Sequence, residues 1–99
     1  MEIKRTEEIA GTSLMGYTET TRAELVRAFG EPIEYGLGDK VTIEWGLEFP
    51  NGTIATIYDW KRYEQGAPAL DESYTYHVGG HSKEALMLVD QALKERVGA

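Results

Sequence analysis

Residues 41–62 read Val-Thr-Ile-Glu-Trp-Gly-Leu-Glu-Phe-Pro-Asn-Gly-Thr-Ile-Ala-Thr-Ile-Tyr-Asp-Trp-Lys-Arg. Apolar and polar residues alternate on both sides of Asn51-Gly52, a dipeptide that strongly favours a two-residue type I′ turn. This stretch therefore predicts a β-hairpin. A two-residue loop also sets the register of the two strands and places Trp45 opposite Tyr58.

The predicted register divides the hairpin into a bulky face and a polar face, because side chains alternate between the two faces of a strand. The bulky face is expected to hold Val41, Ile43, Trp45, Leu47, Phe49, Ile54, Thr56, Tyr58 and Trp60. The opposite face is expected to hold Thr42, Glu44, Gly46, Glu48, Ala55, Ile57, Asp59 and Lys61. We expect the bulky face to pack beneath two helices and Asp59 to face solvent.

A short helix is expected before the hairpin. Thr21 and Glu24 have the spacing of a capping box, in which each side chain satisfies an orphan amide at the start of the helix. Leu25 and Phe29 lie on its apolar stripe, and Gly30 follows as a helix-ending residue. Because a helix of about two to three turns is marginal alone, packing on the sheet must hold it.

A second helix is expected from Ser82, a good N-cap residue, to Val97. Apolar residues recur through it at spacings of three and four, as a core-facing stripe requires. These residues are Ala85, Leu86, Val89, Ala92, Leu93 and Val97. Alternation over residues 73–78 predicts a strand that Gly79-Gly80 would end, and an edge strand is expected somewhere within residues 9–18.

Together these elements predict one domain over residues 1–99 and the α+β class. We expect two layers, in which an antiparallel sheet of three to four strands carries two helices on one face. Residues 63–72 contain Gly66 and Pro68 and read as a mobile loop, whereas residues 1–10 show no clear pattern. An open edge of the hairpin would be the natural contact for a homo-oligomer.

Acidic residues outnumber basic residues by 17 to 10, which gives a formal net charge of −7. Binding to a nucleic-acid backbone requires a concentrated basic surface, so direct nucleic-acid binding is not expected. A basic protein surface is an acceptable partner for such a chain. The acids are scattered along the sequence, so simple solubility also accounts for them.

Cysteine is absent, so the chain has no disulfide framework, thiolate nucleophile or zinc–thiolate site. This composition fits a reducing compartment. The first residues lack the apolar core of a signal peptide, and no apolar run approaches membrane-spanning length. We therefore expect a cytoplasmic protein that does not bind membranes.

Two glycine-flanked polar stretches are the best candidates for a ligand site. Residues 11–17 read Gly-Thr-Ser-Leu-Met-Gly-Tyr, and residues 77–82 read His-Val-Gly-Gly-His-Ser. Backbone amides freed by glycine, next to a helix N-terminus, can hold a small anionic ligand such as a phosphorylated molecule. We expect the two stretches to lie near each other.

The candidate ligand-binding residues are Thr12, Ser13, Tyr17, Lys61, His77, Gly79, Gly80, His81 and Ser82. The alternative is a purely structural turn that leads from a strand into a helix, with Ser82 as the N-cap residue of that helix. Such turns explain the same glycines and are far commoner than phosphate sites, and the stretch is neither a P-loop nor a dinucleotide fingerprint. We favour the turn, and a ligand site at these residues stays the alternative.

Catalytic, metal and cofactor sites are not predicted. His77 and His81 are the two histidines, and Gly79-Gly80 between them argues against one helical face that carries both. A general base needs a nucleophile or a carboxylate within reach, and the sequence does not place one. Tyr63, beyond the hairpin, is a candidate anchor for a protein partner.

The chain also carries a set of short strings that span it from about residue 11 to the second helix. They are Gly11-Thr12-Ser13-Leu14 with Gly16-Tyr17, Phe29-Gly30-Glu31-Pro32, Trp45, Phe49, Asn51-Gly52-Thr53, Ala55-Thr56-Ile57-Tyr58-Asp59-Trp60-Lys61 and His77-Val78-Gly79-Gly80. This combination resembles a group of small bacteriophage and prophage proteins with no established function. The resemblance implies a phage context inside a bacterial cytoplasm. By analogy with small accessory phage proteins, it also implies a binder that blunts or redirects a host system.

Three functions fit these observations. The first is a non-enzymatic binding protein that occupies or sequesters a host component, either a defence-related host protein or a small phosphorylated ligand. The second is an acidic mimic of nucleic acid that inhibits a host DNA-binding protein. The third is a small enzyme that acts through His77 or His81. We favour the first, because no catalytic constellation is assembled and ten basic residues dilute the acids.

Overall fold

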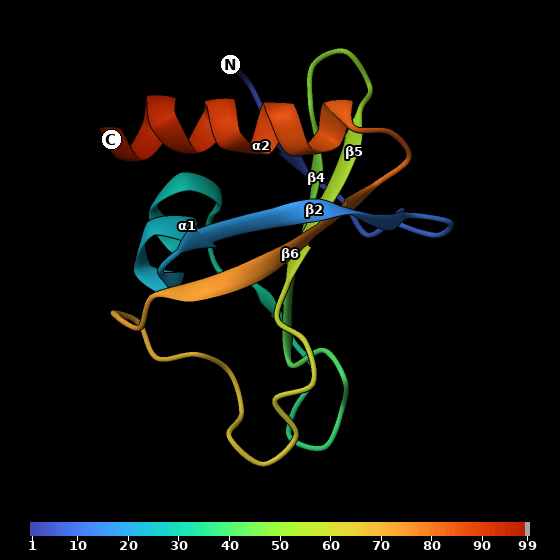
Figure 1. Ribbon diagram of the computed structural model, residues 1–99. Helices are drawn as coiled ribbons and strands as arrows, with labels where there is room; N and C mark the ends of the chain where they lie inside the picture. The colour runs from blue at the N-terminus through green and yellow to red at the C-terminus, as the bar shows by residue number, and fades with distance from the viewer. Residues whose placement is uncertain (99) are drawn as a thin grey trace.

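The structure, a computed structural model, describes residues 1–98. Its elements are β1 (Lys4–Arg5), β2 (Ser13–Thr20), α1 (Arg22–Phe29), β3 (Ile33–Glu34), β4 (Ile43–Glu48), β5 (Ile54–Tyr58), β6 (Tyr74–Gly80), α2 (Glu84–Leu93) and a π-helical turn η1 (Lys94–Gly98). Within these residues a six-stranded antiparallel sheet and two helices confirm the α+β class (Figure 1). The prediction of three to four strands is wrong, because β1 and β3 have two residues each and leave no periodic pattern in the sequence.

The hairpin strands β4 and β5 lie inside the sheet, whose order is β1-β4-β5-β6-β2, with β3 also paired to β4. β1 pairs with Leu47 and Glu48, and β3 pairs with Ile43 and Glu44, so the edge of β4 is covered at both ends. The prediction of an open hairpin edge is therefore wrong. The expected edge strand is β2, which ends the sheet beyond β6. Figure 1 shows β2 and β6 crossing the direction of β4 and β5, so the sheet is strongly twisted.

The hairpin turn has a three-residue loop instead of the predicted two-residue loop. The amide of Gly52 donates to the carbonyl of Phe49 at 2.8 Å, and the amide of Phe49 donates to the carbonyl of Thr53 at 2.9 Å. Gly52 has a φ of 88°, whereas Asn51 lacks the positive φ that a type I′ turn requires. The loop is a type I turn followed by a left-handed glycine. Pro50 favours it, because the fixed φ of proline suits the first central position of that turn.

The longer loop shifts the register by one residue and exchanges the two faces of β5. Trp45 lies opposite Ile57 instead of Tyr58. Trp45 and Ile57 are fully buried in the core. Tyr58 and Trp60, which the sequence placed beneath the helices, belong to the opposite face, and Trp60 is partly exposed.

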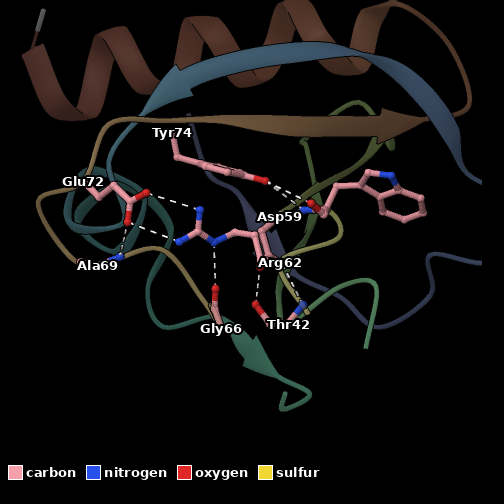
Figure 2. Close-up of polar contacts among 8 residues, drawn as sticks. Thr42, Asp59, Arg62, Gly66, Ala69, Glu72 and Tyr74 are labelled. Carbon is pink, nitrogen blue, oxygen red and sulfur yellow. Dashed lines mark hydrogen bonds and ion pairs between the residues drawn. The ribbon is translucent and has the colours of Figure 1, made fainter. Parts of the chain in front are cut away.

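The same shift buries Asp59, so its predicted exposure to solvent is wrong. The Asp59 side chain is fully buried. Its carboxylate accepts hydrogen bonds from the amide of Thr42 at 2.8 Å and from the hydroxyl of Thr42 (Figure 2). It also accepts one from the amide of Ile43 at 3.1 Å. Three donors satisfy the buried charge and tie the end of β5 to the start of β4.

The polar contacts of Arg62 connect the chain after β5 to the loop that precedes β6. Its Nε donates to the carbonyl of Gly66 at 2.8 Å, and its guanidinium lies 3.4 Å from the carboxylate of Glu72 (Figure 2). The guanidinium also lies 5.1 Å from the ring centre of Tyr74. The segment that the sequence suggested as a mobile loop therefore has internal polar anchors.

Side chains from both helices join one buried apolar cluster with alternate residues of the central strands. The cluster contains Leu25, Ala28, Phe29, Ile43, Trp45, Leu47, Phe49, Ala55, Ile57, Tyr76, Val78, Ala85, Val89 and Ala92. The capping box of α1 is confirmed, since Thr21 and Glu24 bond to each other's backbone amides. The indole Nε1 of Trp45 donates to the carbonyl of Gly30 at 2.7 Å and fixes the end of α1 against the sheet.

Helix α2 begins at Glu84, so the prediction of Ser82 as its N-cap residue is wrong. Lys83 occupies the N-cap position without a side-chain cap, and the carbonyl of Ser82 accepts from the amide of Ala85 at 3.1 Å. Gly79-Gly80 continues β6 instead of ending it. A Cβ at Gly80 would collide with the Cβ of Ala85, so glycine at this position lets α2 lie close to the sheet. Neither α1 nor α2, the helices described within residues 1–98, is long and apolar enough to cross a bilayer.

Candidate functional site

A row of four side chains crosses the sheet on the face opposite to the core. Glu44 on β4 pairs with Tyr58 on β5, Tyr58 pairs with His77 on β6, and His77 pairs with Tyr17 on β2. Residues directly opposite each other in antiparallel strands point to the same face. The register therefore brings together four residues that are far apart in the sequence.

Three aromatic rings contact the imidazole of His77. The centre of the imidazole lies 5.0 Å from the ring of Tyr17, 5.3 Å from that of Tyr58 and 5.6 Å from that of Trp60. The Trp60 ring stacks on the imidazole at 26°, whereas the Tyr17 ring meets it edge-on at 86°. We call Tyr17, Tyr58, Trp60 and His77 the aromatic surface.

The aromatic surface is accessible to solvent. Tyr17 is 54% exposed and Trp60 is 37% exposed, whereas Tyr58 and His77 are partly buried. Exposed aromatic side chains that cluster on one face are uncommon on a protein that has no partner there, because they leave apolar area in water. Large rings with a polar edge are also the side chains that most often anchor protein interfaces.

A partly buried carboxylate forms one border of the aromatic surface. Glu44 accepts a hydrogen bond from the hydroxyl of Tyr35 at 2.8 Å. Burial raises the pKa of Glu44, and the hydrogen bond from Tyr35 partly opposes that rise. Burial, with the hydrogen bond to Glu44 and its negative charge, raises the pKa of Tyr35 to about 12. This tyrosine is therefore a stable donor that holds Glu44 in place.

A second carboxylate and a cation lie near the other rings. Glu19 follows Tyr17 by two residues along β2, so it lies on the same face and is exposed. Lys61 follows Trp60, and its Nζ lies 5.9 Å from the centre of the indole ring. The amide of Lys61 donates to the carbonyl of Lys40 at 2.7 Å, which fixes the backbone from which this side chain extends.

The imidazole of His77 and the phenol of Tyr58 are neutral near pH 7. Burial lowers the pKa of His77, and the negative charge of Asp59 opposes that shift. Burial also raises the pKa of Tyr58, with the charge of Glu44 adding to the effect. At neutral pH the site thus presents uncharged aromatic rings between carboxylates.

The structure separates the sequence-predicted ligand residues into two groups. Tyr17, Lys61 and His77 lie at the aromatic surface. The others, found at the far end of β2 and β6, are Thr12, Ser13, Gly79, Gly80, His81 and Ser82. The expected closeness of residues 11–17 and 77–82 is confirmed, because Ser13 pairs with Gly80 and Tyr17 with His77. Binding of a ligand at these residues stays a prediction.

The glycine-rich end of β6 has structural reasons for its composition. Gly79 and Gly80 pair with strands on both sides, so the sheet ladders use this part of the backbone. The N-terminus of α2 carries its own carboxylate, Glu84, which accepts from the side chains of Asn51 at 3.1 Å and Thr53 at 3.2 Å. A negative side chain at this position opposes a bound anion. The aromatic surface is therefore the stronger candidate.

Tyr63, the predicted partner anchor, is partly exposed in the loop after β5. Its carbonyl accepts from the amide of Gly38 at 3.3 Å, so its backbone contacts the neighbouring loop. Its ring is not one of the three that contact the imidazole of His77.

Sequence reasoning missed Glu44, Tyr58 and Trp60 as site residues. The two-residue turn assigned to Asn51-Gly52 placed both aromatic residues in the core. Pro50 is the sequence feature that indicates the three-residue loop. That loop contains a type I turn, and proline favours the first central position of such a turn.

Within residues 1–98, no group of three or more His, Asp or Glu side chains is arranged to hold a metal ion. The His77 ring contacts other aromatic rings, and it pairs in register with Tyr58 and Tyr17. These neighbours support recognition by shape and ring contact. No protein-family model and no curated protein matches this sequence.

Proposed function

We propose that this protein is a non-enzymatic binding protein that holds a host protein through the aromatic surface. The observation that carries the proposal is the exposed cluster of Tyr17, Tyr58 and Trp60 around His77. Few residues carry most of the energy of a protein interface, and tryptophan and tyrosine are enriched among them. Rings that are already packed against each other also lose little conformational entropy when a partner binds.

The two faces of the sheet would then have different roles, one in the core and one in binding. The helices and the sheet would act as two layers, with α1 and α2 completing the core on one face. Strand residues of the other face would stay available for the partner. Substitutions at the exposed rings should then affect binding more than folding, since Tyr17 and Trp60 lie outside the buried cluster.

The resemblance to small bacteriophage proteins supports a host setting for this activity. In that setting the protein would act in the bacterial cytoplasm and occupy a host component, such as a protein of a defence system. The net charge of −7 supports a basic partner surface, because opposite potentials favour encounter and register.

A pull-down from a lysate of the bacterium that carries the gene tests the proposal. The immobilised wild-type protein is compared with Trp60→Ala, Tyr17→Ala and the control Met87→Ala. Met87 is 69% exposed on α2, which packs on the core side. A partner identified by mass spectrometry should bind again, after purification, to the wild type and to Met87→Ala. Trp60→Ala and Tyr17→Ala should lose it. Equal retention of that partner by all four proteins would contradict the proposal.

A further inference from the structure

The charged side chains around the aromatic surface indicate what kind of group it can hold. Glu44 borders the rings at Tyr58, and Glu19 lies on the same face two residues beyond Tyr17. Residues two apart on a strand are separated by roughly 7 Å, so a group that rests on a ring can reach the neighbouring carboxylate. Rings between carboxylates attract a cation, because the face of an aromatic ring is electronegative.

The molecule already contains one contact of this type. The ammonium of Lys61 lies 5.9 Å from the centre of the Trp60 ring. A cation within about 6 Å of a ring centre is attracted by the ring quadrupole. Lys61 therefore shows that the ring accepts a positive group, and it would compete with one that comes from outside.

We infer that the aromatic surface recognises an arginine side chain in a basic segment of the partner protein, which would stack on the rings and pair with Glu44 or Glu19. This inference rests on the proposed function. Arginine fits better than lysine, because its planar guanidinium both stacks on rings and forms two parallel hydrogen bonds with a carboxylate. The formal charge of −7 complements a basic segment as a whole.

The same charges argue against a phosphorylated ligand at these rings. Glu44 and Glu19 would repel a phosphate group, and Lys61 supplies a single ammonium against them. Loss of the Lys61 charge should therefore have opposite effects on the binding of the two ligand classes. Removal of its charge should strengthen the binding of a cation and weaken the binding of an anion.

The test uses blocked peptides and two-dimensional NMR of the full-length protein at low salt. The probe is acetyl-Gly-Gly-Arg-Gly-Gly-amide. The matched control peptide has citrulline in place of arginine, which keeps the shape and removes the charge. We expect the arginine peptide to shift resonances of Tyr17, Tyr58, Trp60 and His77. The citrulline peptide should bind more weakly by about two- to fivefold or more.

Four variants of the protein complete the test. Glu44→Gln and Trp60→Ala should each weaken the binding of the arginine peptide by about two- to fivefold. Lys61→Asn should strengthen it, and asparagine tolerates the positive φ of 57° at this position. Glu95→Gln, which removes a charge from η1 next to α2, should leave the affinity unchanged.

The outcomes separate this inference from the proposed function. Equal binding of the arginine and citrulline peptides would overturn the inference. So would shifts of the same resonances by inorganic phosphate together with weaker binding of phosphate by Lys61→Asn. If neither peptide binds while retention of the partner still depends on Trp60, the inference fails and the proposed function stands. If retention of the partner is also independent of Trp60, both fail.

Discussion

The indole of Trp60 stacks on the imidazole of His77, with ring centres 5.6 Å apart and planes inclined by 26°. The contact joins a residue just beyond β5 to the middle of β6, on the face of the sheet opposite to the buried Trp45. It makes Trp60 a direct reporter of the charge on His77, because a protonated imidazole quenches the fluorescence of a stacked indole.

Tryptophan emission should fall as the pH is lowered through the titration of His77. Burial lowers the pKa of His77, so the midpoint should lie below the ordinary histidine value of about 6.5. The rings of Tyr17, Tyr58 and Trp60 pack around this group. His77→Gln should abolish the transition, and His81→Gln should keep it.

The lowered pKa of His77 also makes the stability of the folded protein depend on pH. The unfolded chain binds a proton at His77 more readily than the folded protein, because the folded pKa is the lower one. Stability should therefore fall as the pH drops from about 6.5 toward the folded pKa, and this contribution should then level off. Urea unfolding of the wild type and His77→Gln at several pH values measures the difference. If the free energy of unfolding falls by the same amount in both proteins over this pH range, the effect does not come from His77.

Asp59→Asn should destabilise the protein by about 2–3 kcal/mol, because an amide cannot satisfy the three donors that converge on the carboxylate. The donors are the amide and hydroxyl of Thr42 and the amide of Ile43. Urea denaturation measures the loss. Asp39→Asn, at an exposed loop position, is the control and should stay within about 0.5 kcal/mol of the wild type.

Gly80→Ala should cost about 1–3 kcal/mol, since the new Cβ would meet the Cβ of Ala85 and push α2 from the sheet. Thermal unfolding of the single variants and of the double variant Gly80→Ala/Ala85→Gly checks the mechanism. The double variant should be more stable than the sum of the single effects implies. Strict additivity would show that the two Cβ positions do not conflict.

Tyr76→Phe should be neutral or stabilising by up to about 1 kcal/mol, because it removes a buried hydroxyl and leaves the ring in place. Among the described residues, the hydroxyl of Tyr76 has no hydrogen-bond partner. Tyr74→Phe is the matched comparison, since its hydroxyl accepts from the amide of Trp60 at 3.1 Å. That variant should lose about 1 kcal/mol in chemical denaturation. A larger loss of stability in Tyr76→Phe than in Tyr74→Phe would contradict the structure.

Features encoded in a few neighbouring residues could be predicted from the sequence. The capping box of Thr21 and Glu24 and the helix end at Gly30 depend on contacts within one or two turns, and both are present. The alternation of apolar and polar residues on both sides of Asn51-Gly52 likewise predicted the two hairpin strands. The closeness of residues 11–17 and 77–82 was also predicted, and it results from the pairing of β2 with β6.

The faces of the hairpin could not be assigned correctly, because one residue in the turn decides them. A three-residue loop that begins with Pro50 moves Tyr58 and Trp60 from the core to the aromatic surface. It also moves Asp59 from the surface to the core, where the amides that bond to it belong to residues far away in the sequence. The site therefore depended on a register that local propensity does not determine.

The two tryptophans give the most direct test of the binding face, because one spectrum reports on both. The chain contains two tryptophans, and the indole of Trp45 is bonded to the carbonyl of Gly30 in the core. We predict that titration with the arginine peptide shifts the indole N–H signal of Trp60 and leaves that of Trp45 in place. A shift of the Trp45 signal with an unchanged Trp60 signal, or no shift of either, would contradict the claim that the aromatic surface binds a cationic partner.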